Sequence, residues 1–395
     1  MNILQITNYP TVNPMHGGQI RCAEIAKAFR KAGHEVASVA IYIKDHYSEI
    51  GVHDIEFDIN QSKWKNQSPW LSDFYTGLHC DEDPTNFKKI KKQFSNHKFD
   101  YIIVEHPWLS ALANKLCVIF QARLVYSSHN IEWRLKEKML MSDGASNIDQ
   151  IISEIQTLEF AAMRSANVIL TCTDDDKQYT RAIIGMATSV PIVVSGNGVE
   201  PFSCLDERVS DWRGFFGIPT IVFVGSCHLP NATGFWEMLY PGLTFLKPTE
   251  KILVIGGVGQ ILMQPKGAKN FEAVNASRLD IAGTREKIEL QAMVRASHIV
   301  ILPITEGEGS NLKTAEALES GCYIVATTKA FRGYEASMRL PHVAIADTPV
   351  EFRKAIRDFL NTPRNNNLKR SAGIDAYYWE NQLSSAIKAL EDIHI

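Results

Sequence analysis

The sequence predicts an α/β protein made of two doubly wound halves. Three observations support this fold class. Short apolar runs alternate with amphipathic helical stretches, the pattern restarts after the segment 195–219, and 395 residues are enough for two domains with cores. Alternation of this kind implies βαβ units and a parallel sheet in each half.

In the first half, six apolar runs predict strands, at 2–7, 35–42, 101–106, 123–128, 167–172 and 191–196. The segment 18–33 between the first two is amphipathic, because its apolar residues recur on one side, and Gly33 ends it. We expect this half to form an N-terminal, Rossmann-like domain over residues 1–197.

In the second half, six further runs predict strands, at 220–226, 251–257, 279–284, 298–303, 323–328 and 342–347. They predict a second Rossmann-like domain over residues 198–375, joined to the first near 197–217. The amphipathic segment 376–395 is expected to form a helix that packs back on the first domain. In proteins of this architecture, ligands bind in the cleft that the carboxyl ends of the strands face.

Composition narrows the function. Hydrophobic residues make up 45% of the chain and charged residues 22%, and the formal net charge of −3 argues against nucleic acid as the main partner. The seven cysteines form no C-x-x-C pair and fit a reducing cytosol. The first residues, "MNILQITNYP", are typical of a strand and not of a signal peptide, and no apolar run is long enough to span a membrane. The expected location is cytoplasmic.

The stretch "EGEGSNLKTAE", residues 306–316, predicts an anion site. Gly307 and Gly309 allow a tight turn after a strand, and Ser310 is a good N-cap for the helix that follows. The amides at the helix start would then be free to bind an anion: those of Asn311, Leu312 and Lys313.

Lys313 is unusual in this stretch. A cation in the first turn of a helix is mildly destabilising, because that end of the helix dipole is positive. A bound diphosphate would remove the objection. Glu316 shares the face of Lys313 and suits paired hydroxyls such as those of a ribose, and Glu308 could reach the next group along. The alternative is a solvated i,i+3 ion pair worth roughly 0.2–0.5 kcal/mol.

The spacing of Glu308 and Glu316, followed by "ALESGCYIVATT", resembles the donor-site signature of GT-B-fold, retaining glycosyltransferases of the GT4 type. Four other segments are similar to that family: "NPMHGGQIRCAEIAKAFRKAGHEV", "SSHNIEWR", "VVSGNGVEP" and "FVGSCHLPNATG". The resemblance implies the GT-B fold, two Rossmann-like domains facing across a cleft. It also implies transfer of a sugar from a nucleoside diphosphate sugar.

The resemblance further implies roles for individual residues. Glu316 would bind the ribose hydroxyls, Glu308 the donor sugar, and the amides from Ser310 to Lys313 the diphosphate. The other implied contacts are Gly17 and Gly18 at the same phosphates, His129 near the reacting face of the sugar, and Thr284 with Arg285 near the base.

One departure from the family pattern is informative. Many members carry an Arg and a Lys in the first loop of the second lobe, where this sequence has Ser226 and Asn231. Lys313 stands at a position that is usually apolar in those members. We infer that Lys313 neutralises the phosphates from the other side, in a subgroup with a G-x-G-x-x-x-K donor loop.

The resemblance implies same-face transfer with retention, in which the leaving phosphate takes the proton of the acceptor and no metal ion is required. Two acidic runs match the D-x-D metal motif of the other glycosyltransferase fold, "DED" at 81–83 and "DDD" at 174–176. We read the first as part of a polar loop and the second as a helix start. No metal ligand or cofactor is therefore expected.

The expected partners are a nucleotide-sugar donor and a saccharide or lipid-linked saccharide acceptor, in polysaccharide or glycolipid biosynthesis. The basic run 86–100 is either a solvated helix face or a peripheral contact with the anionic inner face of a membrane. Three other functions stay open. They are a nucleotide-sugar 2-epimerase of the same architecture, a non-catalytic scaffold, and an NAD enzyme, which "GGVG" at 256–259 supports weakly because it is not G-x-G-x-x-G.

Overall fold

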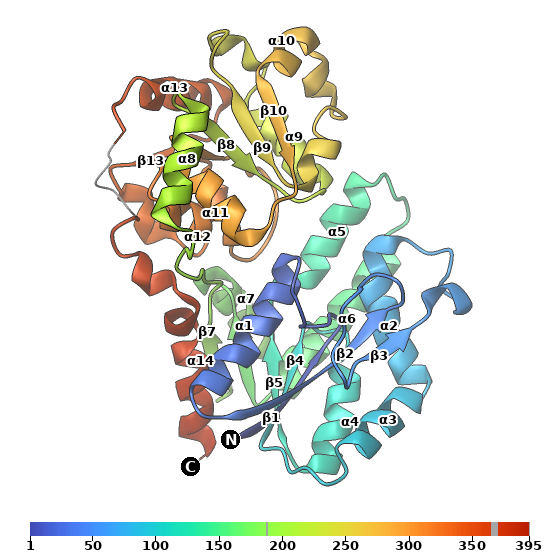
Figure 1. The fold of residues 1–395 in the computed structure, drawn as a ribbon. Coiled ribbons are helices and arrows are strands. Elements are labelled where there is room, and N and C mark those ends of the chain that lie inside the picture. The colour runs from blue at the N-terminus through green and yellow to red at the C-terminus, as the bar shows by residue number, and fades with distance from the viewer. Residues whose placement is uncertain (187–188, 365–369, 395) are drawn as a thin grey trace. The chain divides into compact units, whose positions relative to one another are not determined.

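The computed structural model describes residues 1–186, 189–364 and 370–394. The chain divides into two compact units, Met1–Gly196 with Trp379–Ile395, and Asn197–Tyr378 (Figure 1). Each unit is a parallel β-sheet with helices between its strands, so the predicted fold class of two Rossmann-like domains is confirmed. Ile395, the last residue of the predicted C-terminal helix, lies outside the described residues.

The first unit holds a seven-stranded sheet in the order β3-β2-β1-β4-β5-β6-β7, with every neighbouring pair parallel. Its strands are β1 (Asn2–Thr7), β2 (Glu35–Ile43), β3 (Ile55–Phe57), β4 (Tyr101–Glu105), β5 (Arg123–Ser127), β6 (Val168–Thr171) and β7 (Ile192–Val194). The short β3 was not predicted, because three residues are too few to show a period. The other strands lie within a residue or two of their predicted ranges.

The helices of the first unit are α1 (Gly17–Lys31), α2 (Ser72–Glu82), α3 (Thr85–Gln93), α4 (Ser110–Phe120), α5 (Glu132–Ser142), α6 (Asp149–Ser165), α7 (Asp174–Ile184) and α14 (Trp379–His394). The C-terminal helix α14 packs beside α1 and β7 (Figure 1). The Tyr101 hydroxyl donates to the Leu390 carbonyl at 2.9 Å, and His34 pairs with Glu391 at 3.0 Å. These contacts join residues from opposite ends of the chain into one domain.

The second unit holds a six-stranded parallel sheet in the order β10-β9-β8-β11-β12-β13. Its strands are β8 (Ile221–Val224), β9 (Ile252–Ile255), β10 (Leu279–Gly283), β11 (Ile299–Leu302), β12 (Tyr323–Ala326) and β13 (Val343–Ile345). Its helices are α8 (Asp206–Phe216), α9 (Leu229–Met238), α10 (Glu272–Ser277), α11 (Lys287–Ala296), α12 (Leu312–Ser320) and α13 (Pro349–Leu360). The central strands are buried apolar runs, as expected for a parallel sheet covered on both faces.

The strand orders identify one switch point in each sheet. The chain builds outward from β1 to β3 and then crosses back to place β4 beside β1, and it does the same at β8 and β11. In open α/β sheets, ligands bind outside the carboxyl ends of the strands at this point. The loops after β1 and β4, and those after β8 and β11, are therefore where the topology positions a site.

The basic run at 86–100 forms α3 and the turn after it. Ile90 and Phe94 are buried in the core, and the lysines between them are exposed. This is the solvated helix face of the first alternative, and contact with a membrane surface stays a prediction. Within the described ranges, no helix combines the length and the apolar character needed to cross a bilayer.

Candidate functional site

The switch point of the second sheet brings three sequence-predicted residues together. The Lys313 ammonium on α12 donates a hydrogen bond to Asn231 Oδ1 on α9, at 2.6 Å. The amide of Asn231 in turn donates to the Ser226 carbonyl at 3.0 Å, in the loop after β8. Lys313 therefore contacts Asn231, one of the two positions at which the sequence resemblance implies a cation, although it comes from a different helix. The alternative of a Lys313–Glu316 ion pair is not found among the described residues.

Burial changes the acidity of this lysine. Desolvation lowers the pKa of Lys313 to about 8, although the nearby Glu316 opposes the shift. The Glu316 side chain is exposed, yet the protein crowds it closely enough to raise the pKa of its carboxyl, against the lowering effect of Lys313. A desolvated ammonium at a helix N-terminus is a site in which an anion would restore the full charge.

One local prediction is wrong: Ser310 does not cap α12. Asn311 is the N-cap, and its Oδ1 accepts from the Lys313 amide at 3.1 Å. Ser310 is held instead by Asn197, whose backbone amide donates to the Ser310 hydroxyl at 3.2 Å and whose side chain donates to the Ser310 carbonyl at 3.0 Å. Both Ser and Asn are good caps, and the contact with the distant Asn197 decides between them. Lys313 still lies in the first turn, but its amide is bound to Asn311 and is not free as predicted.

The loop before α12 turns as predicted. Gly307 and Gly309 have φ angles of +117° and +63°, in the region that favours glycine. Arg332 holds the loop from behind: its Nε donates to the Gly309 carbonyl at 2.8 Å, and its Nη2 donates to the Glu308 carbonyl at 3.2 Å. Neither Arg332 nor Asn197 is predicted from the sequence. Only the topology could have found Arg332, because it follows β12, the neighbour of β11.

A close approach fixes α9 against the loop after β11. A Cβ at Gly234 would lie 2.4 Å from the Pro303 carbonyl oxygen, which is backbone and cannot move aside cheaply. We expect Gly234→Ala to destabilise the fold by roughly 1–3 kcal/mol, measured by urea denaturation.

Gly214→Ala is the matched control, because Gly214 lies in helix α8 with nothing within 4 Å of its Cβ position. There the substitution should stabilise by roughly 0.5–1 kcal/mol through helix propensity alone. Equal effects of the two substitutions would contradict the packing argument.

The remaining donor residues of the prediction lie at other places in the fold. Thr284 and Arg285 are exposed and follow β10, the edge strand of the second sheet. Gly17 and Gly18 are the first two residues of α1 in the first unit, after the N-cap His16. The first turn of α1 contains no acidic residue, which suits an anion, although the His16 side chain already accepts a hydrogen bond from the Gln19 amide.

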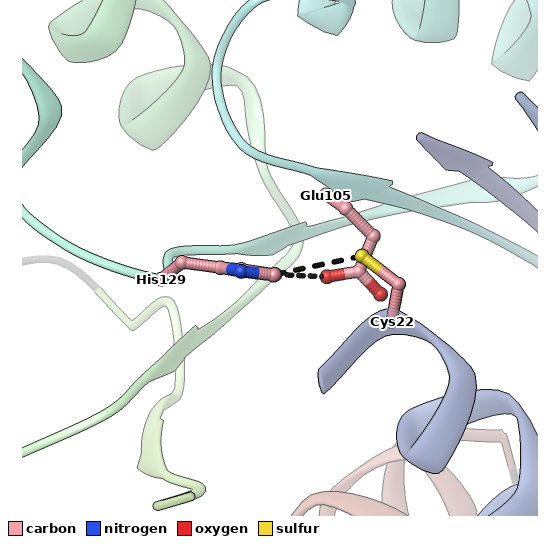
Figure 2. A group of neighbouring side chains, drawn as sticks. All are labelled: Cys22, Glu105 and His129. Atoms are coloured by element: carbon pink, nitrogen blue, oxygen red, sulfur yellow. Dashed lines mark hydrogen bonds and ion pairs between the residues drawn. The ribbon is translucent and has the colours of Figure 1, made fainter. Parts of the chain in front are cut away.

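His129 is buried at the switch point of the first sheet, in a cluster with Glu105 and Cys22 (Figure 2). Its Nε2 donates to Glu105 Oε2 at 2.8 Å, and Gln5 donates to the other carboxylate oxygen at 2.7 Å. Burial opposes ionisation of Glu105, but these hydrogen bonds outweigh it and hold the pKa of the carboxyl below its usual range. Burial and the neighbouring His106 lower the pKa of His129 to about 3. The pair is therefore a carboxylate and a neutral imidazole.

Cys22, Glu105 and His129 have ligand atoms within 4.8 Å of one another, a spacing that a metal ion could use. The Cys22 Sγ lies 4.0 Å from His129 Nε2, the same nitrogen that binds Glu105 (Figure 2). A thiol–imidazole–carboxylate triad needs the two ring nitrogens to serve different partners, so the arrangement is not one. The carboxylate and the imidazole satisfy each other, which makes the cluster a hydrogen-bonded support for His129.

A second imidazole–carboxylate pair lies against the first. The rings of His106 and His129 have their centroids 3.8 Å apart, and His106 Nδ1 pairs with Glu132 at 2.9 Å. Burial would raise the pKa of Glu132, but His106 outweighs it and lowers the pKa to about 2. Glu132 is the first residue of α5, so the N-terminus of this helix supports the histidine cluster.

A buried carboxyl on α6, Glu159, fixes that N-terminus and predicts pH-dependent stability. It accepts hydrogen bonds from the amides of Glu132 and Trp133 at 3.0 and 3.1 Å. Burial and the charge of Glu132 raise the pKa of Glu159 to about 8, against the effect of the amides. The stability from neutral Glu159 is complete below the unfolded pKa of 4.5 and is lost as the pH rises to about 8.

We therefore expect Glu159→Gln to gain stability relative to wild type as the pH rises from about 5 to 8, by at most about 1.4 kcal/mol per pH unit. Urea denaturation at several pH values measures this slope. Glu154→Gln, at an exposed position of the same helix, is the control and should follow wild type. Parallel curves for Glu159→Gln and wild type would contradict the assignment.

Of the two acidic runs, only the run 174–176 lies where the sequence predicts it. Asp174–Asp176 form the first turn of α7, where Thr173 Oγ1 accepts from the Asp176 amide at 3.1 Å. The other run, 81–83, closes α2 instead of lying in a loop, with Asp83 as its C-cap.

Comparisons with known proteins agree with this architecture. Residues 218–362 match the family model of glycosyl transferases group 1. No match is found among curated proteins. Sucrose-phosphate synthase from Thermosynechococcus elongatus is similar in structure, with a TM-score of 0.73 and 14% identity over 99% of this chain and 98% of that one.

Two further solved structures are similar over the full length. A trehalose-6-phosphate structure from E. coli bound with UDP-2-fluoro glucose has a TM-score of 0.68 and 12% identity over 99% of each chain. Anabaena HepE in complex with UDP and glucose has a TM-score of 0.62 and 16% identity over 100% of this chain and 98% of that one. These likenesses show that the chain has the GT-B fold.

Proposed function

We propose that the protein is a glycosyltransferase that moves a sugar from a nucleoside diphosphate sugar to a saccharide or lipid-linked saccharide. The observation that carries the proposal is the hydrogen bond from Lys313 to Asn231 beside the loop 306–310 (the glycine loop), at the switch point of the second sheet. It gathers a desolvated cation and helix amides where the topology directs a ligand. The matched family model spans these residues, and one structural neighbour is bound with UDP-2-fluoro glucose and another with UDP and glucose.

Two chemical requirements of such a transfer would be met by named residues. The leaving diphosphate needs preorganised positive charge, which Lys313 and the amides of the loop and of α12 would supply. The donor must be held still, and we assign Glu316 to the ribose hydroxyls and Glu308 to the sugar. We place His129 near the reacting face of the sugar, and Thr284 near the base. We further propose GT4-type transfer with retention and without a metal ion.

Thermal stability against a ligand panel tests the proposal. The panel is UDP, GDP, dTDP, ADP, CMP and NAD, with a chelator present so that binding cannot depend on a trace metal. A ligand at about 100 times its dissociation constant should stabilise the fold by roughly 2.7 kcal/mol. A shift with one nucleoside diphosphate would support the proposal and name the base. No shift with any of them would favour a non-catalytic scaffold.

The same preparation separates transfer from epimerisation. A 2-epimerase would convert the sugar of the donor with no acceptor present. A transferase should instead release the nucleoside diphosphate, slowly to water and faster to an acceptor. Analysis of the products from donor alone distinguishes the two, and an epimerised sugar nucleotide would overturn the transferase proposal.

A further inference from the structure

Arg332 contacts the glycine loop in a way that neither the family signature nor the predicted site includes. It follows the 3₁₀ turn Thr328–Phe331, which comes after β12. Its guanidinium donates to two consecutive carbonyls, that of Gly309 at 2.8 Å and that of Glu308 at 3.2 Å. Hydrogen bonds from an ionised donor are about twice as strong as neutral ones, and a planar fork fixes direction as well as distance.

The glycine at 307 is required by the backbone of the loop, because its φ of +117° strains any other residue. A Cβ there would lie 3.4 Å from Arg332 Nη2, in ordinary van der Waals contact. The guanidinium therefore packs directly against one side of the loop.

The geometry of the peptide bond determines what lies on the other side. In a trans peptide the C=O and N–H bonds point in opposite directions. Because the carbonyls of Glu308 and Gly309 both point at Arg332, the amides of Gly309 and Ser310 both point away from it. The structure records no hydrogen bond from either amide within the described residues. Two successive amides with a left-handed glycine between them form an anion-binding nest.

We propose that Arg332 is a positioning residue that aims the Gly309 and Ser310 amides at a diphosphate. The inference rests on the proposed function and adds to it that two cations act on the diphosphate in different ways. Lys313 would meet the phosphates directly, whereas Arg332 would act through the loop by holding its carbonyls. The ligand recognised through Arg332 is thus the diphosphate and not the nucleoside.

Calorimetric titration of three ligands tests the inference. The ligands are UDP, uridine and inorganic pyrophosphate, and the proteins are wild type, Arg332→Ala, Arg332→Lys and Arg339→Ala. Arg339 is an exposed arginine of the same unit and serves as the matched control. We expect Arg332→Ala to lower the affinity for UDP and pyrophosphate roughly 10- to 100-fold and to leave uridine unchanged. The affinity of Arg332→Lys for UDP and pyrophosphate should lie between those of wild type and Arg332→Ala, because one ammonium cannot donate to both carbonyls as the planar guanidinium does.

A merely structural role is distinguished by chemical rescue. Arg332 is half-buried, so millimolar guanidinium can enter the gap left by Arg332→Ala and should restore much of the affinity for pyrophosphate. The inference would be overturned if Arg332→Ala lost affinity for UDP and for uridine equally. It would also be overturned if Arg332→Ala bound all three ligands as wild type does.

The pyrophosphate measurements separate this inference from the proposed function. A wild type that binds pyrophosphate in an Arg332-dependent way but binds no nucleoside diphosphate would overturn the sugar-nucleotide proposal and support the positioning role. A wild type that binds neither ligand would overturn both.

Discussion

Lys313→Ala is expected to weaken the binding of nucleoside diphosphates roughly 30- to 160-fold, which corresponds to about two to three kcal/mol for a hydrogen bond to a charged group. Lys313 is the one cation that the structure brings to Asn231 among the described residues. Removing it leaves amides alone to meet the phosphate charge. Isothermal titration with the nucleotide that the panel identifies measures the change.

The same lysine gives the affinity a pH dependence with a definite sign. The pKa of free Lys313 is about 8, and a bound diphosphate must raise it. Above about pH 8 the free protein has lost the proton that the complex needs, so the affinity of wild type should fall as the pH rises. Titration in buffers of different ionisation enthalpy should show proton uptake in that range.

Lys313→Arg is the control for charge, because arginine stays protonated throughout this range. Its affinity should change little between about pH 7 and 9. Asn231→Ala should weaken binding less than Lys313→Ala does, because it removes the partner of the cation and not the cation. A pH profile for Lys313→Ala that matches that of wild type would show that another group titrates.

The sequence predicted the fold well because the fold depends on patterns that extend over many residues. Buried parallel strands such as β9 and β11 are continuous apolar runs. The alternation of helices and strands along the chain then leaves few possible topologies. The three-residue β3 was missed because it is too short for a period to show. The edge of the sheet, where β3 lies, tolerates such short strands.

The site was predictable only where its chemistry is local. The turn at Gly307 and Gly309 and the cation after it are visible in the sequence as a conflict with the helix dipole. The cap was assigned to Ser310 instead of Asn311, because the contact that decides it comes from Asn197, more than one hundred residues away. Arg332 was missed for the same reason.

The first unit carries the second large prediction, which concerns turnover and not binding. Replacement of His129 with alanine is expected to lower the rate of donor cleavage by roughly 10²–10³-fold while leaving the affinity for the nucleoside diphosphate nearly unchanged. An interaction made only in the transition state has this signature. Release of the nucleoside diphosphate from the sugar nucleotide measures the rate, and a loss of affinity equal to the loss of rate would contradict the role.

Glu105 should matter through His129. Its carboxylate accepts a hydrogen bond from the imidazole, with Nε2 2.8 Å from Oε2, and this contact fixes the tautomer of His129. In Glu105→Gln the amide can present a donor to Nε2, which would move the proton to Nδ1. We expect a fall in the rate of about 10-fold or more with no change in the KM for the donor, and a changed ¹⁵N spectrum of the ring.

Cys22→Ala is the matched control, since its sulfur lies 4.0 Å from the same nitrogen in the same buried cluster. Cys22→Ala should keep the tautomer of His129 and most of the rate of donor cleavage. The pKa of His129 is about 3, so this imidazole stays neutral between about pH 5 and 8. Neither wild type nor Cys22→Ala should therefore show a change in rate over that range that arises from this imidazole. An equal loss of rate in Cys22→Ala and Glu105→Gln would show that packing of the cluster, and not the hydrogen bond to Glu105, is what His129 needs.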